Sequence, residues 1–309
     1  MKVYKPRFWS NINLISTLFL PISLIINFIN IYKRRLSKPR SFGIPIICVG
    51  NIYVGGTGKT PTSIFLAKEL NKLKKKPVII RKFYENYEDE HNLIRQNFPD
   101  LILGKTRKDA IQQAKDRGFK SIILDDGYQD FKIKKNLNIL CFNENQLIGN
   151  GLVIPSGPLR ESLYSLKYAE IILINGKRNL DFERKILKIN KNLQVFYSKY
   201  KLVFPYVCKN KNILAFAGIG NPENFFKLLL SNGFNIKRKI NYPDHYKYKR
   251  KELEDIISEA QEKNLEIVTT EKDFYRIKKY KLNKINYIKI EIEISNKDDF
   301  LRNILDIYD

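Results

Sequence analysis

The stretch VGNIYVGGTGKTP, residues 49–61, decides the fold, because it comes close to the sequence of a phosphate-binding loop. Such a loop reads G-x-x-x-x-G-K-[ST], and here Tyr53 stands where the first glycine belongs. An apolar run, IPIICVG, precedes the stretch, and residues 60–73 have a helical pattern, so the strand–loop–helix context is complete. The groups that contact phosphate come later in such a loop than its first glycine. We therefore predict a nucleotide site despite Tyr53.

Each part of this loop has an expected role. Backbone N–H groups of the turn and of the helix start would face the phosphate oxygens. Lys59 would reach the β- and γ-phosphates, and the Thr60 hydroxyl would bind Mg²⁺. The predicted nucleotide-binding residues are Tyr53, Val54, Gly55, Gly56, Thr57, Gly58, Lys59 and Thr60. The alternative is a glycine-rich turn without a ligand, which the GKT sequence and its flanking elements do not favour.

A second acidic element follows in SIILDDGYQD, residues 121–130. Asp125 and Asp126 end a short apolar strand, at the edge of the sheet where the loop also lies. Carboxylates in this position complete the metal site of phosphate-loop proteins. We predict that Asp125 and Asp126, together with Thr60, bind Mg²⁺, and that Asp126 also takes a direct part in catalysis. Which of the two carboxylates contacts the metal is left open, and a solvated turn is the alternative.

Beyond residue 40 the chain alternates short apolar runs with helical segments. This order predicts an α/β fold of the P-loop NTPase type, with a parallel sheet flanked by helices. A change in composition after Tyr200 predicts a linker and then a second, smaller α/β domain. The expected parts are an N-terminal membrane-associated helix in 1–40, a kinase-like P-loop domain in 41–200, a linker in 201–212 and the smaller domain in 213–309.

The N-terminal segment 8–32 contains no charged residue and has basic residues on both sides. It is long enough to span a bilayer, but four asparagines and Pro21 make a span costly. A helical wheel gathers an apolar face of Leu14, Ile15, Leu18, Phe19, Ile22, Ile25, Ile26 and Ile29. We favour an amphipathic helix that lies in the interface of an anionic membrane. A spanning helix and a soluble core helix are the alternatives.

Composition narrows the class of partner. The 309 residues carry a formal charge of +24, which attracts polyanions, although a coding bias towards lysine would produce the same excess. No clustered basic and aromatic patch or known binding module favours nucleic acid, so we expect no nucleic-acid partner. Cys48, Cys141 and Cys208 lie far apart, which predicts neither a disulfide framework nor a zinc site and fits a reducing cytosolic setting.

Longer strings point to a family. They occur in the order VGNIYVGGTGKTP, DDGYQD, GNGLVIPSGPLRESL, AFAGIGNPENFF, YPDHY and TTEKDF. Over nearly the whole chain this pattern resembles tetraacyldisaccharide 4'-kinase, the lipid A kinase of Gram-negative bacteria. The resemblance implies transfer of the γ-phosphate of ATP, with Mg²⁺, to the 4'-hydroxyl of a tetraacylated glucosamine disaccharide 1-phosphate. It also implies a monotopic protein on the cytoplasmic face of the inner membrane, where the product is a lipid A precursor.

The resemblance carries over individual residues. The family pairs the aspartate of a G-D-E-P motif with the histidine of a D-H motif, and Asp89 and His245 hold these positions. It therefore implies that Asp89 is the base or orients the hydroxyl, with His245 as its partner, whereas a buried histidine beside a helix is the alternative. Arg160 and Glu161 match P-L-R-E and would hold phosphate or substrate hydroxyls, or form a structural pair. His91 stands where the family has proline, so we expect a surface residue without a role.

Several departures from the family pattern keep other hypotheses open. The family's S-R-G-Y-G appears as IRKFY, residues 80–84, without either glycine, so the loop near the nucleotide must take another path. Asp130 replaces a histidine of the family, and nothing is carried over there. A relative that has lost activity is one alternative. A membrane-associated partitioning ATPase is another, but that class places a lysine before the two glycines, where this chain has Val54.

Overall fold

The computed structural model describes residues 6–203 and 211–308, and these form two compact units. The larger unit comprises 6–83, 98–199 and 292–308, and the smaller unit comprises 84–97, 200–203 and 211–291. The sequence predicts one linker, 201–212, between the two α/β domains. The two units differ from that division, because 84–97 belongs to the smaller unit and 292–308 to the larger one. Strands reach Val203 and begin again at Asn212, while 204–210, with Cys208, lie outside the described residues.

The larger unit is built on a parallel sheet, as the alternating pattern predicts. Its strand order is β3-β2-β4-β1-β5-β6-β7, and every neighbouring pair in it is parallel. The strands are β1 (Ile46–Gly50), β2 (Pro77–Lys82), β3 (Leu101–Gly104), β4 (Ser121–Asp125), β5 (Leu137–Asn143), β6 (Ile171–Asn175) and β7 (Gln194–Val203). Every residue of β1, β4 and β6 is buried, because helices cover both faces of such a sheet.

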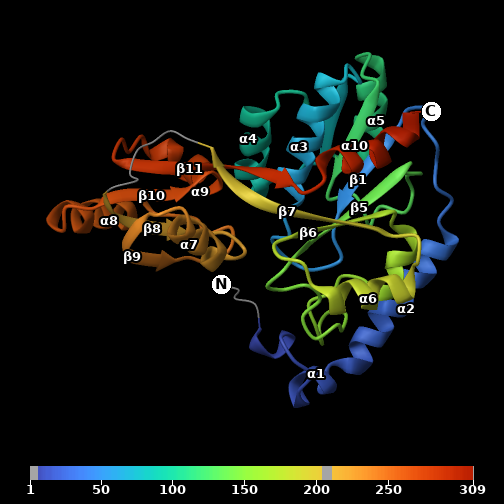
Figure 1. Ribbon diagram of the computed structural model, residues 1–309, viewed down its shortest axis with the longest axis horizontal. Coiled ribbons are helices and arrows are strands. Elements are labelled where there is room, and N and C mark those ends of the chain that lie inside the picture. The colour runs from blue at the N-terminus through green and yellow to red at the C-terminus, as the bar shows by residue number, and fades with distance from the viewer. Residues whose placement is uncertain (1–5, 204–210, 309) are drawn as a thin grey trace. The chain divides into compact units, whose positions relative to one another are not determined.

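Four helices of this unit pack on the sheet (Figure 1). They are α3 (Lys59–Lys72), α5 (Arg107–Asp116), α6 (Leu180–Ile189) and α10 (Lys297–Leu305). The chain leaves the carboxyl end of β1 between β4 and β5, and Val49 of β1 is in register with Asp125 of β4. The loop after β1 and the acidic pair after β4 therefore meet at one edge of the sheet, where ligands of α/β proteins bind.

Two α-helices lie near the start of the chain, where the sequence predicts one. Helix α1 (Leu14–Leu18) has a capping box formed by Asn13 and Ser16, and α2 (Leu20–Leu36) follows after a turn at Phe19. Within the described residues, no helix has both the length and the apolar character needed to cross a bilayer. The apolar side chains of α1 and α2 point largely into solvent, and those of Leu14 and Phe28 are 90% and 69% exposed.

The smaller unit contains four parallel strands in the order β11-β10-β8-β9 (Figure 1). Its elements are α4 (Glu88–Asn97), β8 (Asn212–Ala217), α7 (Pro222–Ser231), β9 (Asn235–Asn241), α8 (Arg250–Glu262), β10 (Glu266–Thr270), α9 (Glu271–Ile277) and β11 (Ile285–Ile294). Alternate residues of β8 point to opposite faces: Ala215 joins the cluster under α7, and Phe216 joins the cluster under α8. This two-layered core fixes the unit.

Two helices, α4 and α10, do not belong to the unit that their place in the sequence predicts. Helix α4 follows β2 in the chain but packs against α9, which places it in the smaller unit. Helix α10 comes last in the chain but packs in the larger unit, where the fully buried Phe300 contacts the rings of Phe65 and Phe196. An amphipathic helix buries its apolar face equally well against either sheet, so the sequence pattern does not distinguish the two.

Candidate active site

The loop between β1 and α3 has a fixed shape. The buried side chain of Asn51 donates to the carbonyl oxygen of Tyr53 at 2.6 Å and to the hydroxyl of Thr57 at 2.9 Å. Gly55 has a φ of 120° and Gly58 one of 93°, which are conformations that glycine adopts without the steric cost other residues incur. The shape of the turn is thus fixed by the hydrogen bonds of the Asn51 side chain and by the backbone conformations of Gly55 and Gly58.

The position of the missing first glycine is supported from outside the loop. Tyr53 forms a β-bridge with Leu159, the N–H of Val54 donates to Pro158, and the N–H of Arg160 donates to Ile52. Tyr53 has no left-handed φ, and its side chain is buried. A glycine is therefore not required at this position, because a neighbouring segment holds the backbone in a conformation open to any residue.

Lys59 and Asp126 face each other at the mouth of this loop. The Nζ of Lys59 lies 3.6 Å from the Oδ1 of Asp126, and the Nη1 of Arg160 lies 3.0 Å from the same oxygen. Burial opposes ionisation of Asp126, but the charges of Lys59 and Arg160, with those of Arg81 and Arg107, outweigh it and lower the pKa of this carboxyl. Asp126 is thus a carboxylate that balances the two cations expected to meet a triphosphate.

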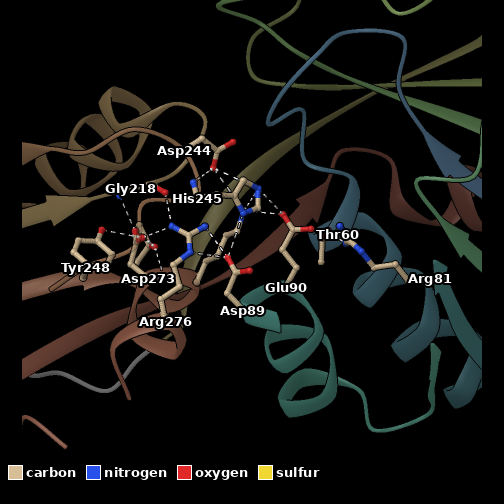
Figure 2. Close-up of polar contacts among 12 residues, drawn as sticks. Thr60, Arg81, Asp89, Glu90, Gly218, Asp244, His245, Tyr248, Asp273 and Arg276 are labelled. Atoms are coloured by element: carbon tan, nitrogen blue, oxygen red, sulfur yellow. Dashed lines mark hydrogen bonds and ion pairs between the residues drawn. The ribbon is translucent and has the colours of Figure 1, made fainter. Parts of the chain in front are cut away.

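Asp125 has a different surrounding. Its carboxylate is fully buried and accepts hydrogen bonds from Ser63 at 3.0 Å and from Thr60 at 3.2 Å. The Nη1 of Arg81 lies 2.6 Å from the Oδ2 of Asp125. It also lies 3.3 Å from the Oγ1 of Thr60, and Figure 2 shows these two side chains next to each other. A positive charge thus already contacts the hydroxyl and the carboxylate that the sequence predicts as metal ligands. Oxygens of this kind are the ligands that Mg²⁺ prefers.

The predicted metal site would have few protein ligands. Across the described residues, no group of three or more His, Cys, Asp or Glu side chains is arranged to hold a metal ion. Thr60 and Asp125 supply one oxygen each, and Asp126 is directed to Lys59 and Arg160 instead. Mg²⁺ is commonly bound by one or two protein oxygens with water and substrate phosphates, so this pair fits it.

Arg160 and Glu161 do not pair with each other in this structure. Arg160 contacts Asp126, whereas the buried Glu161 accepts from Gln129 at 3.0 Å and from Arg34 at 2.6 Å. Arg160 therefore belongs with the cations at the phosphate loop. Glu161 is directed to the N-terminal helix and to a hydrogen-bonded neighbour of the loop, which places it as a support for that loop.

A second cluster lies within the smaller unit around Asp89, in the first turn of α4 (Figure 2). The Nε and Nη2 of Arg276 lie 2.7 and 2.6 Å from the Oδ2 of Asp89. Arg276 comes from α9 and also donates to Asp273 and to the carbonyl oxygen of Gly218. Asp89 is buried, so this two-nitrogen contact fixes the orientation of its carboxylate.

His245 lies in the same cluster but does not hydrogen-bond to Asp89. Its Nδ1 is 3.8 Å from the Oδ2 of Asp89, which is beyond hydrogen-bonding distance. Its Nε2 is 3.4 Å from the Nζ of Lys272, and Lys272 in turn lies 2.6 Å from Glu90. Burial has the largest effect on the pKa of His245 and lowers it, and the charge of Lys272 lowers it further. The nearby carboxylates raise the pKa by less than this. The imidazole is therefore neutral at pH 7.

The sequence does not predict Lys272 and Arg276 as members of this cluster, and the prediction that His91 lies at the surface is wrong. Lys272 and Arg276 lie four residues apart in α9, a spacing that puts them on one face, but their partners come from a segment far away in the chain. The string TTEKDF contains Lys272 and was the available signal. His91, expected at the surface, is buried, because it lies in α4, which packs against α9.

Comparisons with known proteins agree on one family. The model of the family described as tetraacyldisaccharide-1-P 4'-kinase, LpxK, matches residues 15–309. A tetraacyldisaccharide 4'-kinase of Pelagibacter ubique is 39% identical over 99% of this chain and 98% of its own length. One from Rickettsia felis is 35% identical over 96% of this chain and 95% of its own length.

A solved structure shares the fold. The crystal structure of LpxK from Aquifex aeolicus in complex with ATP matches with a TM-score of 0.73. It covers 96% of this chain and 100% of that chain, at 22% sequence identity. At this level of identity the match shows a common fold.

Proposed function

Since the chain belongs to the tetraacyldisaccharide-1-P 4'-kinase family, we propose that it transfers the γ-phosphate of ATP to the 4'-hydroxyl of tetraacyldisaccharide 1-phosphate, a step of lipid A biosynthesis. The observation that carries the proposal is the preformed turn of residues 51–58 beside Lys59. Its glycines bend the backbone, its N–H groups lie at the start of α3, and Lys59 is balanced by Asp126. A triphosphate suits this arrangement of amides and an ammonium.

Mg²⁺ would be held by Thr60 and Asp125, whose oxygens already meet at 3.2 Å. When bound, the ion would neutralise charge on the phosphate oxygens. Asp126 would keep Lys59 and Arg160 in place before the nucleotide binds, and these cations would then contact the phosphates. Arg81 would give up its contact between Thr60 and Asp125 to the ion, because both need the same two oxygens.

Asp89, in the smaller unit, would act on the hydroxyl that accepts the phosphate. Arg276 fixes the Oδ2 of Asp89, so Oδ1 would orient the sugar hydroxyl and receive its proton. A transition state for phosphoryl transfer is loose, and orientation by the carboxylate then matters more than its strength as a base. His245 is neutral, and it would serve as the neighbouring proton acceptor in the cluster rather than as a fixed charge.

The N-terminal helices would bring the enzyme to its substrate. A lipid with four acyl chains stays in the bilayer, so the kinase must bind the membrane surface. Helix α2 turns Ser23, Asn30 and Arg34 towards the protein and leaves Ile25 and Phe28 exposed. This is the reverse of a helix in a soluble domain, and it suits a monotopic helix in the interface on the cytoplasmic face of the inner membrane. Lys33 and Lys38 would meet anionic headgroups.

Transfer of labelled phosphate from ATP to the acylated disaccharide, followed by thin-layer chromatography, tests the proposal. Wild type should label the lipid, whereas Lys59→Ala and Asp89→Ala should each lose most of the transfer while retaining the fold. Asp89→Asn keeps the shape of the side chain and removes its charge, so it separates packing from chemistry.

A partitioning ATPase would release phosphate into water without any lipid acceptor. Val54 already disfavours that class, because it stands where that class has its signature lysine, before the two glycines. Release of inorganic phosphate by wild type at the same rate with and without lipid, and no labelled lipid, would contradict the kinase assignment.

A further inference from the structure

Helix α2 contacts the rest of the larger unit through polar side chains on one face. Ser23 donates to the carbonyl oxygen of Val153 and to the hydroxyl of Ser156, both at 2.8 Å, and Asn30 donates to the carbonyl oxygen of Arg160 at 2.9 Å. Arg34 follows one turn later and binds Glu161 at 2.6 Å. Spacings of seven and four residues keep these side chains on one stripe. The whole stripe thus contacts residues 153–161, which we call the docking segment.

The docking segment also forms the outer wall of the phosphate loop. Leu159 pairs with Tyr53, Pro158 accepts from Val54, and the N–H of Arg160 donates to Ile52. The side chain of Arg160 then contacts Asp126. One short stretch of chain is therefore hydrogen-bonded to α2 on one side and to the nucleotide loop on the other.

A second route joins the same two places through side chains. Glu161 accepts from Arg34 with one oxygen and from Gln129 with the other. Gln129 also donates to the carbonyl oxygen of Asn51 at 3.0 Å, and the side chain of Asn51 holds the inside of the turn through Tyr53 and Thr57. The chain of contacts thus runs from Arg34 to the interior of the loop without a gap.

Arg34 is held in a fixed orientation. Its guanidinium lies 4.1 Å from the ring centre of Phe131, 4.4 Å from that of Tyr168 and 5.1 Å from that of Tyr128. Its partner Glu161 has only 5% of its side chain exposed. A planar cation that is stacked and paired in this way has one geometry, and loss of it leaves a buried carboxylate to reorganise with Gln129.

We propose that α2 and the phosphate loop are coupled through the docking segment, with Arg34 as the positioning residue, so that binding of α2 to a membrane raises the affinity for nucleotide. The inference rests on the proposed function, because it takes α2 as the membrane-binding helix and the loop as the nucleotide site. Coupling is reciprocal, so nucleotide must raise the affinity for membrane by the same factor.

The test compares Arg34→Gln with Arg35→Gln in the full-length protein. Both variants remove one positive charge from the last turn of α2, but Arg35 is exposed. The dissociation constant of a fluorescent ATP analogue is measured in detergent micelles and on vesicles that contain phosphatidylglycerol. We expect Arg34→Gln to weaken nucleotide binding about tenfold in micelles, a usual size for coupling between sites. Arg35→Gln should leave it unchanged, and Arg34→Lys should restore only part of the loss.

A second measurement separates positioning from general damage. In wild type, vesicles should tighten nucleotide binding, and saturating nucleotide should tighten vesicle binding by an equal factor. In Arg34→Gln both factors should fall towards one, with the Michaelis constant for ATP raised and that for the lipid little changed. Equal nucleotide affinities of wild type and Arg34→Gln would overturn the proposal, as would a wild type whose nucleotide affinity ignores the vesicles.

Two further outcomes are informative. If Arg34→Gln does not fold, as circular dichroism would show, Asn30→Ala decides instead, because it removes one hydrogen bond to the same segment. Weaker nucleotide binding by Asn30→Ala supports the coupling, and unchanged binding overturns it. A wild type that binds no nucleotide would remove the proposed function itself, whereas a wild type that binds it independently of α2 removes only the coupling.

Discussion

Replacement of Arg81 by methionine tests whether this side chain occupies the place of the metal ion. The Nη1 of Arg81 lies 2.6 Å from the fully buried carboxylate of Asp125, and 10% of the arginine side chain is exposed. Removing one partner of a buried ion pair costs about 3–5 kcal/mol. The hydroxyls of Ser63 and Thr60 still donate to Asp125, so we expect the low end, about 3 kcal/mol.

Mg²⁺ should return most of that loss in the variant and do little in wild type. An ion at a hundred times its dissociation constant stabilises the folded state by about 2.7 kcal/mol. In the variant the ion meets the Asp125 carboxylate without the guanidinium beside it, whereas in wild type it must first displace the guanidinium. The midpoint of urea or thermal unfolding, with and without Mg²⁺ and without nucleotide, measures the difference.

A matched control is available on the surface of the same unit. Arg184 lies in α6 with 74% of its side chain exposed and pairs with Asp181, three residues away. Arg184→Met changes the net charge equally and should shift stability by less than about 1 kcal/mol, with or without Mg²⁺. If Mg²⁺ stabilised wild type and Arg81→Met alike, or if Arg81→Met were as stable as wild type in its absence, Arg81 would not be standing in for the ion.

Three other predictions follow from named contacts. Arg276→Lys keeps the charge but loses the two-nitrogen contact with Asp89, so the turnover number should fall at least tenfold while nucleotide affinity, measured by fluorescence, stays constant. The pKa of His245 is lower in the folded state than in the unfolded chain, so the unfolded chain binds more protons. The contribution of His245 to the free energy of unfolding should therefore be constant above about pH 6.5 and fall below it. His245→Gln should flatten that fall when unfolding is measured against pH. Phe28→Asp should weaken vesicle binding in a flotation assay by at least tenfold, since burial of a phenylalanine contributes about 1.5–3 kcal/mol, and Leu230→Asp, an exposed apolar residue of α7, serves as the control.

The part of the site that the sequence predicts is the part made by neighbours in the chain. The loop after β1, the helix that follows it and the acidic pair at the end of β4 each depend on a short run of residues. Asp125 and the loop meet because parallel strands end at one edge of a sheet, so the pattern of strands was enough to place them. The N-terminal pattern likewise predicts an apolar face of eight residues, and six of them are exposed in the structure, while Phe19 and Ile26 are half-buried.

What the sequence does not predict is made by partners far apart. Arg276 is 187 residues from Asp89, and Arg34 is 127 residues from Glu161. An arginine has no periodic pattern that names its partner, and a chain with 56 basic residues offers many candidates. The polar stripe of α2 shows the same limit, since the sequence indicates a stripe but not that it contacts residues 153–161 rather than headgroups. The placement of α4 with α9 has the same cause.

Four of the arginine–carboxylate contacts in and around the two clusters differ in exposure. Exposure separates the contacts that a ligand can open from those that hold the site in shape. Arg160 and Asp126 have 29% and 28% of their side chains exposed, so their contact contributes about 0–1 kcal/mol and opens easily for a phosphate. Arg276 with Asp89 and Arg34 with Glu161 are buried pairs, and opening them costs several kcal/mol. They are therefore fixed supports.

Arg81 combines the two behaviours, because its contact is buried but lies on the oxygens that a metal ion would need. Opening it is costly unless the ion arrives to replace the lost charge. Binding of the metal would then be coupled to release of the guanidinium. The released cation would carry a full positive charge beside the phosphate loop, where a triphosphate would stabilise it. Arg81 would thus weaken binding of the ion when no nucleotide is present. It would strengthen binding of the ion and the nucleotide together.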